Sequence, residues 1–336
     1  MAMRRFSNDF RAIVKNVDLS HKEITLYADG GESLLSFRGS DNEDSLPGPT
    51  LDGAVLDECG IMKGSIWPEY IRPMLMVKKG WCDFIGTPKG GGWYKDLWVQ
   101  AEEDPDWTRF HAPSNNSPFV DAEEFERIRK HTPDLIFRQE YLADFIDDGA
   151  GVFTNIRGCI KGLFSGPEFG ANYVMGVDLA RKHDWTVITV IDIYSQHVVH
   201  WERFNQIDWN TQERRIAAIA KRYNAPINID ATGVGDPIVE RLINAGLAVN
   251  PVVFNNSIKT FMVQNLALLI EQGEISYPEE PTLLAELSVF SGEQNNGKWK
   301  YGAPSGYHDD AVMSLCLATK DMGSVSDGPM FGDVGI

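Results

Sequence analysis

Residues 172–193, NYVMGVDLARKHDWTVITVIDI, decide how the larger part of this chain folds. Their apolar runs at 173–177 and 187–193 are rich in β-branched side chains and predict two neighbouring strands, joined by a polar turn at 181–184. Asp178 is then a lone carboxylate in a strand that is otherwise buried. Because burying a carboxylate is costly unless it is paired or binds a cation, this position predicts a partner.

Two later segments also place carboxylates at the ends of elements. Asp230 ends a short apolar strand, and the pair Asp309 and Asp310 opens an apolar helix. Oxygen ligands of this kind suit Mg²⁺ or Mn²⁺. Two such ions about 4 Å apart would activate a water and stabilise the leaving oxygen of a phosphodiester. The acids therefore predict a metal-dependent nuclease; the structural alternative is that they only form turns and cap a helix.

The composition sets outer limits on the class of protein. A chain of 336 residues with 43% hydrophobic residues is long enough for two domain cores. The four cysteines include no C-x-x-C pair, which argues against a zinc site or a disulfide framework and fits a reducing cytoplasm. No apolar run approaches the ~20 residues that span a bilayer, so we expect a soluble protein without a membrane partner.

The net charge of −17 at pH 7 is unusual for a protein that holds DNA, because phosphate binding relies on Lys and Arg. Either a local basic strip or a partner that holds the DNA would resolve this conflict. Lys78 with Lys79, and Arg181 with Lys182, are candidates for such a strip. Ordinary solvated charge clusters are the alternative.

The first half carries two features of a phosphate-loop ATPase. A short apolar strand ends in Asp57 and Glu58, an arrangement that places Asp on Mg²⁺ and Glu beside the attacking water. A strand at 80–85 leads into a Gly-rich loop with Thr87, which could sense the γ-phosphate. The phosphate loop G-x-x-x-x-G-K-[ST] is missing from residues 1–56, and we interpret the near-match at 292–298 as a hairpin turn.

The second half predicts an α/β fold. Three strands in a meander followed by alternating helices and strands indicate a mixed sheet with helices on its faces. We expect strands at 23–27, 33–37, 196–204 and 227–230, and helices at 122–129, 135–145, 211–223, 237–245, 258–272 and 311–319. We place a first domain at 1–146, a connector at 147–170, a second domain at 171–320 and a disordered tail at 321–336.

Several motifs occur in an order that is more specific than any one of them. They are AVLDE (54–58), GTPKG (86–90), LIFRQEYLADFIDDGAGVF (135–153), GVDLA (176–180) followed by Asp184-Trp-Thr, NIDATGVGDPIVERL (228–242) and HDDAVMSLCLA (308–318). Over nearly its whole length the chain resembles the large subunit of a tailed-bacteriophage terminase, a DNA-packaging motor and nuclease. The resemblance implies part of a phosphate-loop ATPase domain, followed by a ribonuclease H-like nuclease domain.

The resemblance also implies roles for individual residues. Two divalent ions in the nuclease would be held by Asp178, Asp230, Asp309 and Asp310, with Asp310 preferred over Asp309 for direct coordination. Asp184 would be an auxiliary acid and His308 an outer donor or a ligand, and the DNA backbone would be contacted by Lys259, Arg181 and Lys182. In the ATPase half, Asp57 would assist Mg²⁺, Glu58 would orient water and Thr87 would couple hydrolysis to movement.

The chain departs from the family pattern at its start, where the adenine-binding motif and Walker A are absent. We therefore expect an N-terminally incomplete ATPase that uses ATP only if a separate polypeptide supplies the missing part. The implied partners are double-stranded DNA, the terminase small subunit, the portal protein and other copies in a ring, in the host cytoplasm and transiently on the procapsid. A catalytically inactive motor fragment that acts as a scaffold, or a resolvase-like nuclease, are the alternatives.

Overall fold

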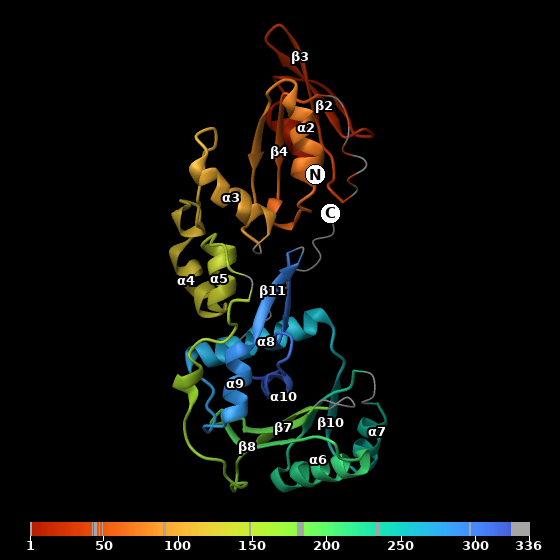
Figure 1. Ribbon diagram of the computed structural model, residues 1–336, viewed down its shortest axis with the longest axis vertical. Coiled ribbons are helices and arrows are strands. Elements are labelled where there is room, and N and C mark those ends of the chain that lie inside the picture. Colours follow the sequence, from red (N-terminus) through yellow and green to blue (C-terminus); the bar gives the residue numbers. More distant parts are fainter. Residues whose placement is uncertain are drawn as a thin grey trace. The chain divides into compact units, whose positions relative to one another are not determined.

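The computed structural model describes residues 2–41, 43, 46, 48, 50–89, 92–147, 149–179, 185–232, 236–295 and 297–323. The chain divides into two compact units, Met1–Gly86 and Thr87–Ile336, which are drawn together in Figure 1. Among the helices in the described ranges, none has both the length and the hydropathy that a membrane span requires.

The first unit contains a small antiparallel sheet and a parallel pair of strands. The antiparallel sheet follows α1 (Ala2–Asp9) and consists of β1 (Val14–Asp18), β2 (Glu23–Ala28) and β3 (Gly31–Ser36). Ala28 pairs with Gly31, so a two-residue turn joins β2 to β3, and Gly30 in that turn has the positive φ of 84° that favours glycine. The predicted hairpin is confirmed, whereas β1 was not predicted.

The parallel pair carries the ATPase-like motifs of the first half. It consists of β4 (Gly53–Leu56) and β5 (Trp81–Phe84), linked through the short π-helix η3 (Ile66–Ile71) and α2 (Arg72–Met76). Parallel strands need a crossover of this kind because a tight turn cannot join them. Asp57 and Glu58 follow the end of β4 and are exposed, and Glu58 has a left-handed backbone with φ of 60°.

The second unit is built on a mixed five-stranded sheet, as predicted. Its order is β10-β9-β6-β7-β8, in which β6–β8 form an antiparallel meander, while β9 is parallel to both β6 and β10. The strands are β6 (Tyr173–Asp178), β7 (Thr186–Asp192), β8 (His197–Phe204), β9 (Ile227–Asp230) and β10 (Val249–Val252).

Helices cover both faces of this sheet (Figure 1). One face is covered by α6 (Trp209–Tyr223) and α7 (Asp236–Asn244), and the other by α8 (Asn256–Gln272), α9 (Pro281–Val289) and α10 (Asp310–Thr319). The unit also contains α3 (Trp93–Glu103), α4 (Ala122–Lys130), α5 (Asp134–Tyr141) and the hairpin of β11 (Ser291–Asn295) and β12 (Lys298–Gly302). The hairpin interpretation of 292–298 is confirmed, and α9 and β10 were not predicted.

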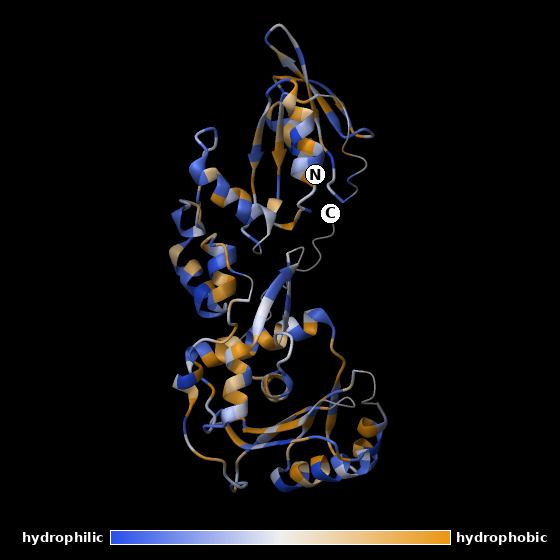
Figure 2. Cartoon of the chain, viewed as in Figure 1, coloured by the Kyte–Doolittle hydropathy of each residue, from blue (hydrophilic) through white to orange (hydrophobic). Residues whose placement is uncertain are grey.

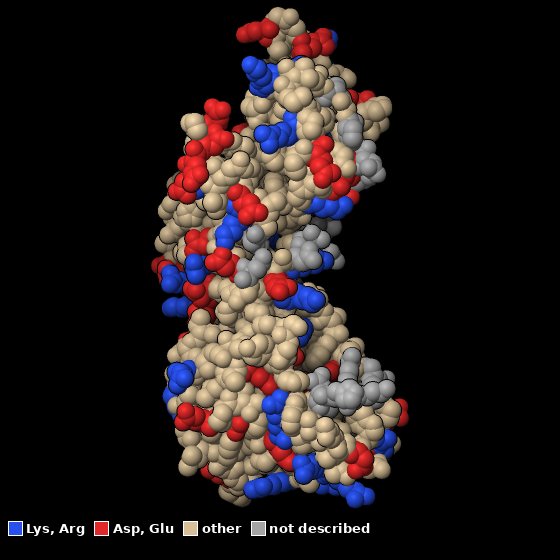
Figure 3. Space-filling model, in the orientation of Figure 1, with Lys and Arg blue, Asp and Glu red and all other residues tan. Residues whose placement is uncertain are grey.

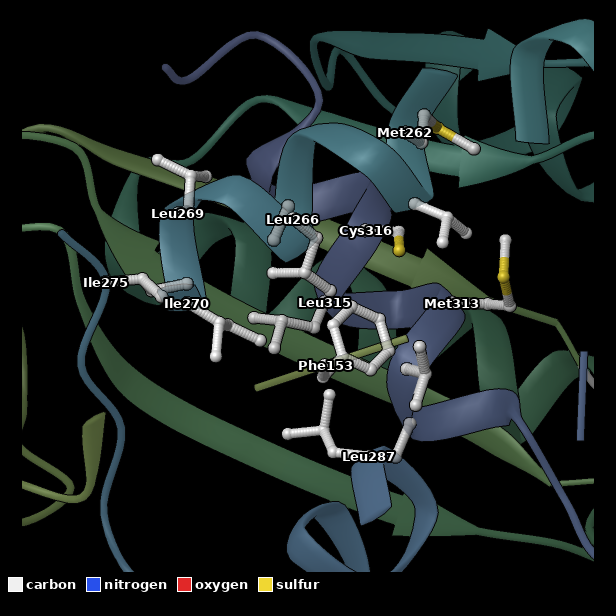
Figure 4. Packing of buried hydrophobic residues seen from close by; sticks show 14 of the residues in the cluster. Phe153, Met262, Leu266, Leu269, Ile270, Ile275, Leu287, Met313, Leu315 and Cys316 are labelled. Carbon is white, nitrogen blue, oxygen red and sulfur yellow. The ribbon is translucent and has the colours of Figure 1, made fainter. Parts of the chain in front are cut away.

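Alternation along each strand divides the apolar residues into two cores. In β6, Met175 and Val177 pack toward α6 and α7, while Val174 packs toward α8–α10. Figure 4 shows the second core, where side chains of α8 and α10 meet Phe153 and Leu287. In Figure 2 hydrophobic orange dominates β7, whereas α6 carries both colours, as a surface helix does.

Gly176 lets α10 pack directly on the backbone of β6. A Cβ atom added at this glycine would lie 2.1 Å from the carbonyl oxygen of Ser314 and 2.4 Å from the amide nitrogen of Ala318. The Ser314 hydroxyl also donates to the Gly176 carbonyl at 3.0 Å. This close contact sets the position of α10, and therefore of the acids at its start, over the end of the strand.

Candidate functional site

The strand register brings chemically active side chains into one row at one end of the sheet. Val177 pairs with Ile229, so Asp178 and Asp230 end two adjacent strands. On the other side, Asp178 pairs with Val187, and Val187 pairs with Arg203 of β8. Neighbouring strands lie about 4.8 Å apart, so residues from three distant segments lie side by side at the same end of the sheet.

All members of this row face α8–α10. Val187 belongs to the core on that side, and Asn228, two residues before Asp230, donates to the Leu317 carbonyl of α10 at 3.0 Å. Because side chains two residues apart on a strand point to the same face, Asp230 points the same way as Asn228. Residues Asp309 and Asp310, at the start of α10, complete the group from above the sheet.

The other three acids lie close enough to Asp178 for their charges to act on it. Burial raises the pKa of Asp178 well above its usual range, and the charges of Asp310, Asp230 and Asp309 raise it further, in that order. Lys259 acts in the opposite direction, but it does not offset these effects. The fold therefore brings carboxylates from β6, β9 and α10 to the same end of the sheet.

Each acid also makes local contacts. The Oδ1 atom of Asp230 accepts a hydrogen bond from the Thr232 amide at 2.7 Å, as the turn alternative predicted. Asp309 stands at the N-cap position of α10 but makes no side-chain capping bond. Instead, its Oδ2 atom accepts a hydrogen bond from Lys259 Nζ at 3.0 Å. The Nδ1 atom of His308 lies 3.5 Å from Asp310 Oδ2.

The donor set suits a hard divalent cation. It consists of carboxylate oxygens, with no cysteine in the row, and the mutual repulsion felt by Asp178 is the kind that a bound cation removes. As placed, no three His, Cys, Asp or Glu side chains of the described residues already form a metal cage. The acids fit Mg²⁺ or Mn²⁺ by chemistry, and their side chains would have to close around the ion.

Two charged residues beside the acids were missed from the sequence. Arg203 Nη2 lies 3.3 Å from Glu286 Oε1 and 4.0 Å from Asp310 Oδ2. Glu286 belongs to α9, the helix that was not predicted, and its Oε2 atom accepts a hydrogen bond from the Ala311 amide at 2.8 Å. The available signal was a lone carboxylate inside the apolar run LLAEL at 283–287.

The remaining predicted site residues belong to the first compact unit, to the start of the second, or to segments outside the described residues. Arg181, Lys182 and Asp184 lie outside the described residues. Asp57 and Glu58 belong to the first compact unit, whereas Thr87 begins the second. On the face seen in Figure 3, blue basic and red acidic side chains are interspersed over the surface, in keeping with the net charge.

A mixed sheet with helices on both faces and acids near one end of its central strands is the architecture of the ribonuclease H-like class. Family comparison agrees: the terminase RNaseH-like domain matches residues 175–320, and the N-terminal domain of T4likevirus-type terminase large subunits matches residues 3–157. The chain belongs to the terminase large-subunit family, which confirms the predicted family and fold class.

Individual relatives extend this result. The terminase large subunit of Thermus virus P23-45 is 34% identical, over 89% of this chain and 68% of that protein. That of Thermus phage G20c is 33% identical with the same coverage. The crystal structure of the G20c large terminase nuclease is 30% identical over 51% of this chain and 97% of that one, with a TM-score of 0.48, and it was also solved with bound magnesium. A large terminase from another thermophilic bacteriophage shares the fold, at 14% identity and a TM-score of 0.53, over 95% of this chain and 81% of that one.

Proposed function

We propose that this chain is the endonuclease of a viral DNA-packaging terminase and that it cuts concatemeric double-stranded DNA with two divalent metal ions. One observation carries the proposal: Asp178, Asp230, Asp309 and Asp310 come from three distant segments and meet at one edge of the sheet. A partly buried carboxylate whose pKa is raised by desolvation and by neighbouring carboxylates, as that of Asp178 is, is typical of a functional site.

The four acids take different roles as metal ligands in this proposal, according to their surroundings. Asp178 and Asp310 are the inner ligands in this proposal, because Asp310 is almost buried and Asp178 faces the other three acids. Asp230, fixed by its bond to Thr232, is the ligand from the neighbouring strand. Asp309 is partly neutralised by Lys259 and serves as an outer or exchangeable ligand.

When bound, the divalent ions supply an activated water and neutralise the leaving oxygen of the phosphodiester. The chain's own residues orient that reaction. His308 lies beside Asp310 as an outer donor, and Lys259 keeps a positive charge at the edge of the site that a DNA phosphate can approach. We propose Arg181 and Lys182 as further contacts to the DNA backbone and Asp184 as an auxiliary acid.

For the ATPase half we propose a conditional role. Asp57 would assist Mg²⁺, Glu58 would orient water and Thr87 would couple hydrolysis to movement. ATP-driven translocation would require a G-x-x-x-x-G-K-[ST] segment, and residues 1–336 contain none. Family membership supports the portal protein, the small subunit and further copies in a ring as partners, with action in the host cytoplasm and transiently on the procapsid.

Plasmid cleavage tests the proposal directly. The purified chain is incubated with Mg²⁺ or Mn²⁺ beside Asp178→Asn and Asp230→Asn, while ATP hydrolysis is followed in parallel. A matched control is Asp192→Asn, which changes the acid at the end of β7 opposite to the end that pairs with Asp178. Metal-dependent cleavage that is lost in both site variants and kept in the control supports the nuclease. No cleavage by the unmodified chain would favour a scaffold role, and preference for branched DNA would favour a resolvase-like nuclease.

A further inference from the structure

A buried ion pair lies beside the acids but outside the proposed ligand set. The side chains of Arg203 and Glu286 are 17% and 7% exposed, and that of their neighbour Asp310 is 8% exposed. Burying three charges is costly, and such groups persist in proteins when geometry or function depends on them. Two carboxylates here share one guanidinium, so the arrangement is more than a simple stabilising pair.

Trp185 and Glu286 contact Arg203 from two sides. The register Asp178–Val187–Arg203 places it two strands from Asp178 on the same face of the sheet. The Trp185 ring centroid lies 4.3 Å from Arg203 Cζ, which restricts the plane of the guanidinium. Glu286 approaches the same group from α9 at 3.3 Å. A planar fork held on two sides is suited to orient a carboxylate.

Glu286 also connects Arg203 to the backbone at the start of α10. One of its oxygens accepts the Ala311 amide, directly after Asp310, while the other faces Arg203. The first turn of α10 and the guanidinium are thereby tied to one side chain. Arg203 Nη2 and His308 Nδ1 both approach the Oδ2 atom of Asp310, at 4.0 Å and 3.5 Å, so both groups lie beside the same oxygen of that carboxylate.

We propose that Arg203, held by Glu286 and Trp185, is a positioning residue that orients the Asp310 carboxylate for a divalent cation. A guanidinium has no lone pair to offer a metal, so Arg203 acts only through Asp310. Groups that orient metal ligands typically change metal affinity by about 10–100-fold when removed. The inference rests on the proposed nuclease function and assigns Arg203 and Glu286 a role within it.

The sign of the effect separates positioning from simple electrostatics. Removing a positive charge near a cation site should strengthen cation binding if charge alone matters. Loss of an orienting group should weaken it. We expect Arg203→Met to weaken Mn²⁺ binding about tenfold, measured by isothermal titration calorimetry without DNA. Arg203→Lys, which keeps the charge but lacks the fork, should recover only part of the affinity.

A double variant keeps the test sharp if Arg203→Met alone is unstable. Glu286→Gln retains an oxygen for the Ala311 amide, so Arg203→Met combined with Glu286→Gln removes the ion pair without leaving the Glu286 charge unpaired. We expect urea unfolding to show recovered stability in the double variant, whereas Mn²⁺ affinity stays about tenfold low.

The matched control is Arg215→Met on α6. Arg215 also has an ion pair, with Glu202 at 2.9 Å, and a ring partner, Phe204 at 5.0 Å, but it contacts none of the four acids in any described interaction. Mn²⁺ affinity should be unchanged in this control. Unchanged or tighter Mn²⁺ binding in the folded Arg203 variants would overturn the inference alone. A wild-type chain that binds no Mn²⁺ would overturn the proposed function and this inference with it.

Discussion

Lys259 Nζ lies 3.0 Å from Asp309 Oδ2, so one acid of the candidate site already has a cation supplied by the chain itself. The two side chains are 27% and 31% exposed. Arg203 Nη2 lies farther from its aspartate, 4.0 Å from Asp310 Oδ2, but the two side chains are less exposed, at 17% and 8%. The two adjacent aspartates thus have different partners, one that is exchangeable with solvent and one that is locked in the fold.

Replacing Lys259 should strengthen metal binding. The ammonium competes with a divalent cation for Asp309, so Lys259→Gln is expected to bind Mn²⁺ roughly two- to fivefold more tightly without DNA, the range of a partly exposed ion pair. Titration calorimetry measures this change. Lys320→Gln, which disrupts an ion pair with Asp321, is the control. Weaker Mn²⁺ binding in Lys259→Gln would instead show that Lys259 orients the Asp309 carboxylate for the metal.

Neutralising Asp178 should stabilise the metal-free protein. Its carboxylate is partly buried and is repelled by Asp310, Asp230 and Asp309, so ionisation costs free energy in the folded state. Asp178→Asn is expected to raise the melting temperature by a few degrees in EDTA and to abolish the further rise that Mn²⁺ produces in wild type. Differential scanning calorimetry in both conditions checks this. A lower melting temperature in EDTA would mean that the ionised carboxylate has a stabilising partner.

Adding a methyl group at Gly176 should destabilise the protein and displace the start of α10, which carries two of the site acids. The new Cβ would clash with the backbone of α10 at Ser314 and Ala318, so Gly176→Ala is expected to cost about 1–3 kcal/mol of unfolding free energy and to reduce cleavage. Urea unfolding and plasmid cleavage measure the two effects. Gly151→Ala, where a Cβ meets nothing within 4 Å, is the control. Equal stability of the two variants would contradict the close packing.

The loss of folding stability at acidic pH should depend in part on His200. Burial lowers the pKa of His200, and Arg222 acts in the same direction, while Glu202 opposes them. Because the folded-state pKa is depressed, neutral His200 contributes stability above its unfolded value of about 6.5, and this contribution is lost as pH falls through the folded value.

The corresponding measurement compares urea unfolding at neutral and mildly acidic pH. His200→Phe should lose less unfolding free energy than wild type on acidification, because it has no proton to take up. His131→Gln changes an exposed histidine at the end of α4 and should behave like wild type. If the unfolding free energies of His200→Phe and wild type depend on pH in the same way, His200 does not contribute to the loss of stability at acidic pH.

Cleavage should fall steeply as salt concentration rises. With a net charge of −17, the chain has weak intrinsic attraction for DNA, and its few basic contacts are screened by ions. Initial cleavage rates between low and moderate salt at fixed Mn²⁺ test this expectation. Constant rates over that range would indicate recognition that does not depend on phosphate charge.

Local patterns were sufficient for much of the fold. The β-branched runs around Asp178, the hairpin after Glu23 and the apolar helix after Asp310 all form where periodicity predicted them. Helix α9 was not predicted because its short apolar stretch has little helical amphipathicity. Strand β10 was not predicted because it contains a proline and is held in the sheet by pairing with β9, which is distant in sequence.

The acids of the candidate site were recognisable as strand-end and helix-start carboxylates, but their partners were not. Nothing within a few residues of Arg203 distinguishes it from a surface charge, and the local signal for Glu286 was only its place in the apolar run at 283–287. Only the register of β6–β8 and the packing of α9 against α10 bring them to Asp310. The sequence alone determined the family, the fold class and the candidate acids, because these depend on local periodicity and motif order. The tertiary structure decided which cation neutralises which carboxylate, because that depends on contacts between segments far apart in the chain.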